Sequence, residues 1–150
     1  MTPIRFADES HRQGLSAALK AVRRRRGRTA AEVAEVMGMP LRSYEHFEAG
    51  QGRFDFDKVR RFAEVLEADP FAILTAVQIA APAFAARCAD NKMMLALLIR
   101  LEEFQRELGE TVADLDPALV LAELGEAFGR MDRELRRRAR LEERPADYFP

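Results

Sequence analysis

The polar side chains between residues 41 and 46 are the ones whose types and spacing suggest chemistry most directly. Arg42 carries a planar guanidinium, Glu45 a carboxylate and His46 an imidazole. These groups donate or accept hydrogen bonds, and a guanidinium can bind two acceptors on one guanine edge at the same time. Glu45 could accept a hydrogen bond from a cytosine amino group, or its charge could repel unsuitable sequences. The segment therefore offers side chains that can hydrogen-bond another molecule, base edges among the possible partners.

The residue patterns of enzymes and metal sites are absent from this sequence. It has no glycine-rich phosphate loop, and Cys88, His11 and His46 lack the spacing of a nucleophilic pair or a metal-ligand cluster. We therefore predict no catalytic residue, no metal and no cofactor.

Two short helices are expected to position this polar segment, and residues 29–50 contain the signals for both. Thr29 followed by Glu32 forms a capping box that begins a helix, and Gly38 is suited to end it. A second helix follows directly after Pro40, with Tyr44 and Phe47 on a narrow apolar stripe. The side chains away from this stripe remain free to contact another molecule.

This arrangement resembles the helix-turn-helix of the Cro and phage-repressor class, often called XRE-type. The resemblance lies in G-x-T, E-V-A, M-G-M and Y-x-x-F-E-x-G, and it covers about residues 14–74. It implies an all-α fold whose first part is a five-helix, lambda-repressor-like DNA-binding domain. In that class the second helix of the motif, here about residues 40–48, lies in the major groove of DNA.

The resemblance also implies roles for individual residues. Gln51 and Arg53 match positions that touch the sugar-phosphate backbone, and Arg23 matches an arginine that pairs with the glutamate closing the recognition helix, here Glu48. Leu41 stands where the class often has a polar base reader, which could mean recognition of DNA shape, a contact with a thymine methyl group, or a domain that has partly given up DNA. The predicted DNA-binding residues are Arg28, Thr29, Pro40, Leu41, Arg42, Ser43, Glu45, His46, Gln51 and Arg53.

Composition is compatible with a cytoplasmic DNA-binding protein. The chain has 150 residues, 48% of them hydrophobic and 33% charged, with a formal net charge of −1. Its start lacks the apolar segment of a signal peptide, and the lone Cys88 cannot form an internal disulfide. The net charge hides a local concentration of cations between Arg23 and Arg28. Such a run is either a solvated helix end or a set of phosphate contacts, and the adjacent motif favours the second for some of its members.

The remaining apolar spacing divides the chain into two regions. Helices are predicted over about 10–25, 56–66 and from Pro70, which with the motif complete a DNA-binding domain at residues 1–78. Residues 71–86 lack any charge, but the run is too short for a membrane span and Pro82 interrupts it, so we expect two buried helices and no membrane partner. Residues 79–150 form the second region, with a mobile tail at 145–150.

The second region is patterned for helix association. Helices at about 91–112 and 117–141 should form a hairpin, and each carries apolar residues at alternating steps of three and four, as in a heptad seam. A lone hairpin cannot cover its own seam, so we expect a homodimer; an intramolecular cap on the first domain is the alternative. The predicted dimer interface consists of Met94, Leu97, Leu101, Phe104, Leu108, Leu121, Leu124, Phe128, Met131 and Leu135.

Together these patterns predict a sequence-specific transcriptional regulator that binds double-stranded DNA as a homodimer on a palindromic operator. The resemblance favours repression. The alternatives are an activator that contacts RNA polymerase, and an antitoxin or adaptor that retains the fold and binds another regulatory protein.

Overall fold

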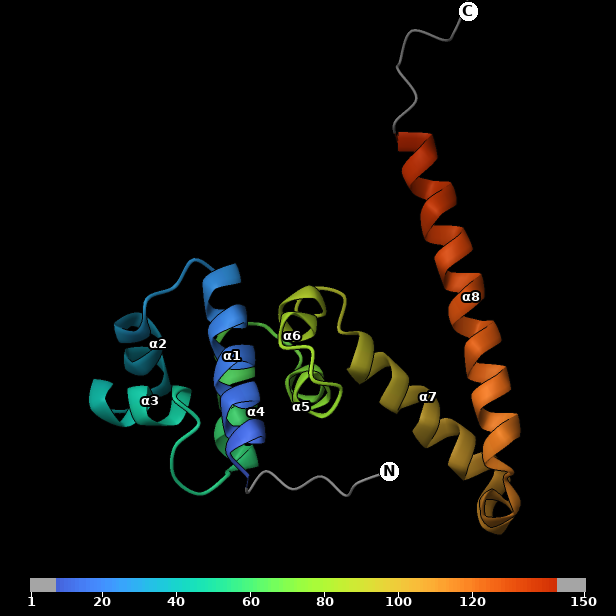
Figure 1. Ribbon diagram of the computed structural model, residues 1–150, viewed down its shortest axis with the longest axis horizontal. Coiled ribbons are helices and arrows are strands. Elements are labelled where there is room, and N and C mark those ends of the chain that lie inside the picture. The colour runs from blue at the N-terminus through green and yellow to red at the C-terminus, as the bar shows by residue number, and fades with distance from the viewer. Residues whose placement is uncertain (1–7, 143–150) are drawn as a thin grey trace, which may run out of the picture. The chain divides into compact units, whose positions relative to one another are not determined.

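The computed structural model describes residues 8–142, and this part of the chain is all-helical, without strands (Figure 1). It divides between residues 103 and 104 into two compact units. The helices are α1 (Glu9–Arg25), α2 (Ala30–Met37), α3 (Leu41–Glu48), α4 (Phe56–Val65), α5 (Pro70–Gln78), α6 (Ala83–Arg87), α7 (Met93–Leu108), the 3₁₀ helix η1 (Gly109–Asp114) and α8 (Pro117–Glu142).

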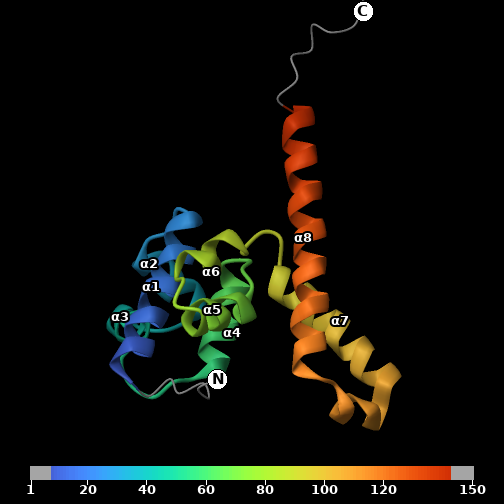
Figure 2. The ribbon, with the colours of Figure 1, turned by 45° about the vertical axis from the view of Figure 1, so that its right-hand side comes forward.

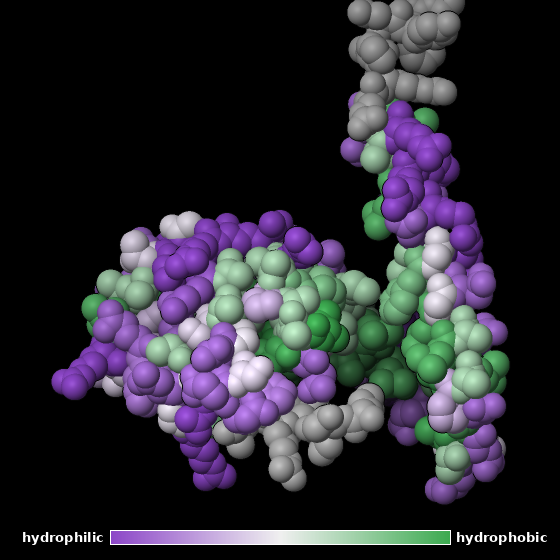
Figure 3. Space-filling model, viewed as in Figure 1, coloured by the Kyte–Doolittle hydropathy of each residue, from purple (hydrophilic) through white to green (hydrophobic). Residues whose placement is uncertain are grey.

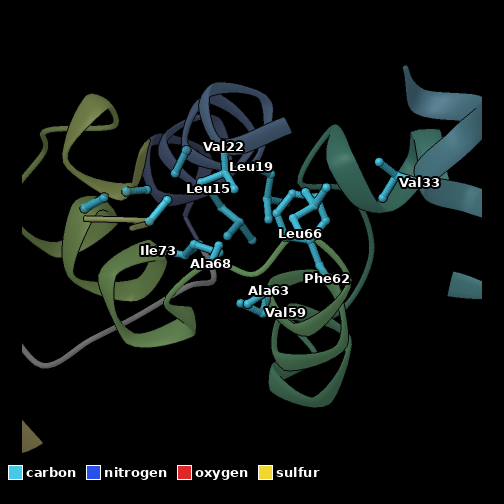
Figure 4. Packing of buried hydrophobic residues seen from close by; sticks show 14 of the residues in the cluster. Leu15, Leu19, Val22, Val33, Val59, Phe62, Ala63, Leu66, Ala68 and Ile73 are labelled. Carbon is cyan, nitrogen blue, oxygen red and sulfur yellow. The ribbon is translucent and has the colours of Figure 1, made fainter. Parts of the chain in front are cut away.

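The first unit is built around α1, which packs against α3, α5 and α6 (Figure 2). Its apolar face contributes Leu15, Leu19 and Val22 to a core in which Phe62 of α4 and Ile73 of α5 are fully buried (Figure 4). The five helices predicted from the sequence are all present. Removal of this apolar surface from water is the main force that holds the short helices together, since helices of eight to ten residues are marginal alone.

A sixth helix, α6, completes this core. It packs on α1 and α5, and Ala85 is fully buried. Beyond α6, Asp90 accepts hydrogen bonds from two arginines of the α1 end: Arg25 Nη2 lies 2.7 Å from Oδ2, and Arg26 Nη1 lies 2.6 Å from Oδ1. Side-chain hydrogen bonds from both arginines lower the pKa of Asp90 to about 2. The charged end of α1 is therefore tied to the segment that follows α6.

The second unit contains the end of α7, η1 and α8. The helix predicted over 91–112 ends earlier, at Leu108, because Gly109 adopts a left-handed conformation with φ of 54° and a 3₁₀ turn follows. Asp116 and Pro117 begin α8 as predicted, with Asp116 Oδ1 accepting from the Ala118 N–H at 2.9 Å. The predicted tail at 145–150 lies outside the described residues.

The predicted seam is open to solvent in the single chain. No residue of α7 or α8 is buried. Met94 and Leu108 are half-buried, and the other eight seam residues are exposed. Among the described helices, none combines the length and the apolar character that crossing a membrane requires.

Candidate nucleic-acid interface

The inner face of α3 is fixed to the core by a buried polar cluster. Tyr44 is fully buried and its hydroxyl donates to Glu48 Oε2. Arg23 of α1 reaches the same carboxylate with two hydrogen bonds, Nε to Oε2 at 2.7 Å and Nη2 to Oε1 at 2.9 Å. The predicted pairing of Arg23 with Glu48 is thus present, and Tyr44 joins it. This bidentate pair sets the rotation of α3 about its own axis.

Electrostatics within this cluster are consistent with its burial. The pKa of Arg23 is raised, first because its guanidinium donates to Glu48. The pKa of Tyr44 is also raised, first by burial and then by the neighbouring Glu48 carboxylate. Tyr44 therefore remains a neutral hydrogen-bond donor at physiological pH, and Arg23 remains a cation. The Arg23 and Tyr44 donors are used by Glu48 within the fold, so this cluster is not expected to bind a ligand.

The outer face of α3 presents a contiguous set of free side chains. Leu41, Arg42, Ser43, Glu45 and His46 are all exposed, while Phe47 is half-buried and packs against the core. Pro40 precedes the helix and provides no side-chain cap. The N–H groups at the start of α3 therefore have no side-chain acceptor at that residue, whose carbonyl accepts from the Tyr44 N–H at 3.0 Å.

The turn between α2 and α3 is short and depends on one glycine. Gly38 is left-handed, with φ of 65° and ψ of 37°, and the Met39 N–H donates to Ala34 O at 3.0 Å. The helices pack directly against each other after this turn. Two short helices joined so tightly form a rigid unit, which is what a base-reading helix needs for a fixed approach.

The start of α2 contains the predicted capping box. Thr29 Oγ1 accepts from the Glu32 N–H at 3.2 Å, and the Thr29 N–H donates to Glu32 Oε2 at 2.7 Å. The hydrogen bonds that the Thr29 N–H and hydroxyl donate to the Glu32 carboxylate lower the pKa of Glu32. Arg28, directly before the cap, has an exposed side chain, and its carbonyl accepts from Arg23 Nη1 at 3.0 Å. The same contact that holds α3 thus also positions the entry into α2.

A surface hollow brings together residues from α3 and the loop after it. Its lining includes Ser43, His46, Gln51 and Arg53, four of the predicted DNA-binding residues. It also includes Lys58 of α4, which our reading of the sequence missed. Lys58 stands three residues after the Asp55 cap, and only its proximity to Arg53 in the folded chain identifies it. The hollow thus gathers two cations, Arg53 and Lys58, and one carboxylate, Asp55, beside α3. Asp55 Oδ1 accepts from the N–H groups of Asp57 and Lys58.

The arginine run at the end of α1 has mainly structural contacts. Arg25 and Arg26 bind Asp90, and Arg26 also donates to the carbonyls of Leu66 at 2.7 Å and Glu67 at 2.8 Å. Arg23 is engaged with Glu48. The expected phosphate contacts therefore reduce to Arg24 and Arg28, whose side chains are exposed and form no ion pair in residues 8–142.

The comparison with known families agrees with this geometry. Residues 15–72 match the family model described as a helix-turn-helix domain. These residues are a helix-turn-helix domain. The match agrees with the resemblance to the Cro and phage-repressor class and runs from within α1 to the start of α5. No curated protein and no solved structure gave a significant match.

The helix-turn-helix domain places all ten predicted DNA-binding residues on its surface. Five of them lie on α3, and Pro40 directly precedes that helix. Two more lie at the entry to α2. Gln51 and Arg53 flank the hollow beside α3. A helix-turn-helix domain is the module of DNA-binding regulators, and its second motif helix is the element that enters the major groove. In this chain the second helix of the motif is α3.

Proposed function

We propose that this protein is a sequence-specific transcriptional regulator that binds a palindromic operator as a homodimer. The observation that supports it best is the two-sided character of α3. Its inner side is locked by Tyr44, Glu48 and Arg23, while its outer side exposes every predicted base-reading residue. A rigid helix with a free polar face can enter a major groove without first reorganising.

Arg42 is the proposed main base reader. Its exposed guanidinium can donate to guanine O6 and N7 together, a contact that discriminates against other bases by about 1–3 kcal/mol. Leu41 would contact a thymine methyl group. Glu45 and His46 would add contacts or reject competing bases. Arg53, Lys58, Arg28 and Gln51 would bind phosphates on either side of the groove and set the register of the domain on DNA.

The proposed dimer gives the operator its symmetry. A two-fold pair presents two α3 helices to half-sites about 34–36 Å apart, one turn of DNA. The exposed apolar seam supports self-association, because a stripe of that kind on a soluble protein is usually covered by a partner. Repression would follow from occupying a promoter. An operator placed beside the polymerase site would instead allow activation.

The first experiment is genome-wide footprinting of the tagged protein, with Arg42→Ala as the test variant and Arg87→Ala, an exposed arginine of α6, as the matched control. We expect palindromic peaks that persist in Arg87→Ala and disappear in Arg42→Ala. In vitro, Arg42→Ala should weaken the best site by about 5- to 150-fold. Affinity for that site should fall steeply with salt.

Two outcomes would contradict the proposal. Equal enrichment of Arg42→Ala and the unmodified protein would remove α3 from sequence recognition. No enrichment for either would mean that the domain binds a protein partner, as in an antitoxin or adaptor.

Dimerisation is tested separately with Leu101→Asp combined with Phe128→Asp, which should halve the mass in solution. An unchanged mass would exclude the seam as the dimer interface.

A further inference from the structure

The apolar stripe of α8 is the largest feature of the described chain that lacks a partner. Leu121, Leu124, Phe128, Met131 and Leu135 follow one another at steps of three and four, and all five are exposed, Leu121 by 74%. In water an uninterrupted stripe of this kind favours association with another apolar helix face. Within the unit that contains α8, no described residue buries this stripe. A second apolar helix face would cover it.

The charges of α8 are divided between its two halves. Residues 117–129 carry two carboxylates, Glu123 and Glu126, and no cation. Residues 130–142 carry six arginines against three carboxylates. Figure 3 shows the hydrophilic character of the C-terminal half of α8 and the hydrophobic side chains exposed nearer its start. The helix is therefore acidic and apolar at one end and basic at the other.

This division makes α8 complementary to a reversed copy of itself. Arg136 pairs with Asp132 of its own helix, and Arg137 and Arg138 pair with Glu134, so the basic half keeps an excess of three positive charges. In a parallel pair the two basic halves would lie at the same end and repel each other. In an antiparallel pair the acidic half of each copy lies beside the basic half of the other, and the two helix dipoles also oppose. Phe128 is the middle residue of the stripe, so reversal about a two-fold axis near Phe128 keeps both stripes in register.

Gly125 supports a close approach at this point. It lies beside the stripe in the middle of an exposed helix, where glycine weakens the helix relative to alanine. A Cβ built at Gly125 would meet no atom within 4 Å. No described atom of the chain therefore requires a glycine here, and the missing side chain lets a partner helix approach closely at this position.

We propose that the occupant of this surface is α8 of a second copy, antiparallel, with the two-fold axis near Phe128. The inference rests on the homodimer of the proposed function and specifies how its two chains meet. The interface is isologous: each copy contributes the same stripe, and Leu121 of one copy lies toward the Leu135 end of the other. An antiparallel pair shifted by eleven residues along the helix axis would lose this charge complementarity, and so would a parallel pair.

Two exposed alanines give a direct test of direction. Ala118 and Ala139 lie on the same side of α8, three heptads apart and near opposite ends. In the antiparallel pair residue 118 of one copy lies near residue 139 of the other, whereas the two copies of residue 118 are about 30 Å apart along the axis at 1.5 Å per residue. We would co-express full-length Ala118→Cys and Ala139→Cys with tags of different size and treat the purified protein with a short bis-maleimide.

We expect the mixed cross-link to exceed the self-link of either variant several-fold, and the unmodified chain, which retains only the buried Cys88, to remain unlinked. Self-links as strong as the mixed link would indicate a parallel pair and overturn the inference. A dimer by sedimentation without any cross-link would place the interface elsewhere and overturn it as well. A monomer by sedimentation would remove the homodimer from the proposed function, while DNA binding, measured separately, would still stand or fall on Arg42.

Discussion

The carboxylate of Asp69 connects the starts of two helices, because its Oδ2 accepts a hydrogen bond from the Leu95 N–H in α7 at 3.0 Å. Its Oδ1 accepts from the N–H groups of Phe71 and Ala72 at the start of α5, at 3.0 and 3.2 Å. Asp69 is fully buried, and it lies 26 positions before Leu95. One side chain therefore caps α5 and fastens α7 to the first unit.

Replacing Asp69 should have graded effects. Asp69→Asn keeps the Oδ1 acceptor for α5, since asparagine is an equally good cap, but turns an amide donor toward the Leu95 N–H. We expect a loss of about 1 kcal/mol in unfolding free energy and faster hydrogen exchange at Leu95. Asp69→Ala removes both caps and should cost about 1–2 kcal/mol more.

Urea unfolding and amide exchange would measure these changes, with Asp55→Asn at the exposed cap of α4 as the control. That control should remain close to the unmodified protein. If Asp69→Asn were as unstable as Asp69→Ala, the α7 contact would not contribute separately.

The ion pair beneath α3 makes the second prediction. Glu48→Gln should lower the unfolding free energy by about 3 kcal/mol, because it leaves the Arg23 guanidinium, whose side chain is only 16% exposed, without a counter-charge. Glu45→Gln, on the exposed face of the same helix, is the matched control and should change stability by less than about 0.5 kcal/mol. Denaturant titrations would measure the unfolding free energy of both variants. Equal values for Glu48→Gln and Glu45→Gln would show that the pair of Arg23 and Glu48 is dispensable.

Much of this fold was predictable because its signals are local. The capping box at Thr29, the glycine after α2 and the cap-then-proline pair at Asp69 each predict a helix boundary that the structure contains. The Arg23 and Glu48 pairing came from the resemblance to a known class. The role of Gly109 was not foreseen, because an apolar pattern that continues past a glycine does not by itself reveal a left-handed residue.

The contacts made across the fold were beyond local reasoning. Arg25 and Arg26 appeared to be candidates for phosphate binding, but their partner Asp90 lies 64 or more residues away. Lys58 joined the candidate interface only because the folded chain places it on the hollow that Ser43 and His46 also line. In the same way the sequence placed Asp69 at one cap, while its second bond to Leu95 required the position of α7. Such long-range pairings depend on packing that no short pattern encodes.

The ion pairs of Asp90 with Arg25 and Arg26 should make the stability of the protein depend on pH. Its folded pKa of about 2 lies below the ordinary 3.8, so its stabilising contribution is present above about pH 4 and is lost as pH falls toward 2. Asp90→Asn should therefore be less stable than the unmodified protein near neutral pH, and the difference should shrink between pH 4 and 2. Because the Asp90 carboxylate and its arginine partners are accessible to solvent, added salt should also reduce this difference in stability.

Thermal unfolding from pH 2 to 7 at low and high salt would measure this difference. Asp114→Asn, in the exposed η1 turn, is the control and should follow the unmodified protein at every pH. A constant gap between Asp90→Asn and the unmodified protein down to pH 2 would contradict the assigned role of Asp90.

The close contact between α1 and the end of α3 makes the last prediction. Gly50 has φ of 70°, and a Cβ built there would lie 2.3 Å from the backbone oxygen of Arg12. Gly50→Ala must therefore both strain the left-handed backbone, by about 1–2 kcal/mol, and push α1 away from α3. We expect a loss well above 2 kcal/mol in unfolding free energy, together with weaker DNA binding because α3 moves relative to the loop with Gln51 and Arg53.

Gly14→Ala is the matched control for Gly50→Ala. This glycine is inside α1, and its added Cβ would meet Val77 at an ordinary 3.6 Å. Alanine should therefore stabilise the helix by about 0.5–1 kcal/mol. Opposite signs for the two substitutions in chemical unfolding would support the contact, and equal effects would show that α1 and α3 do not approach this closely.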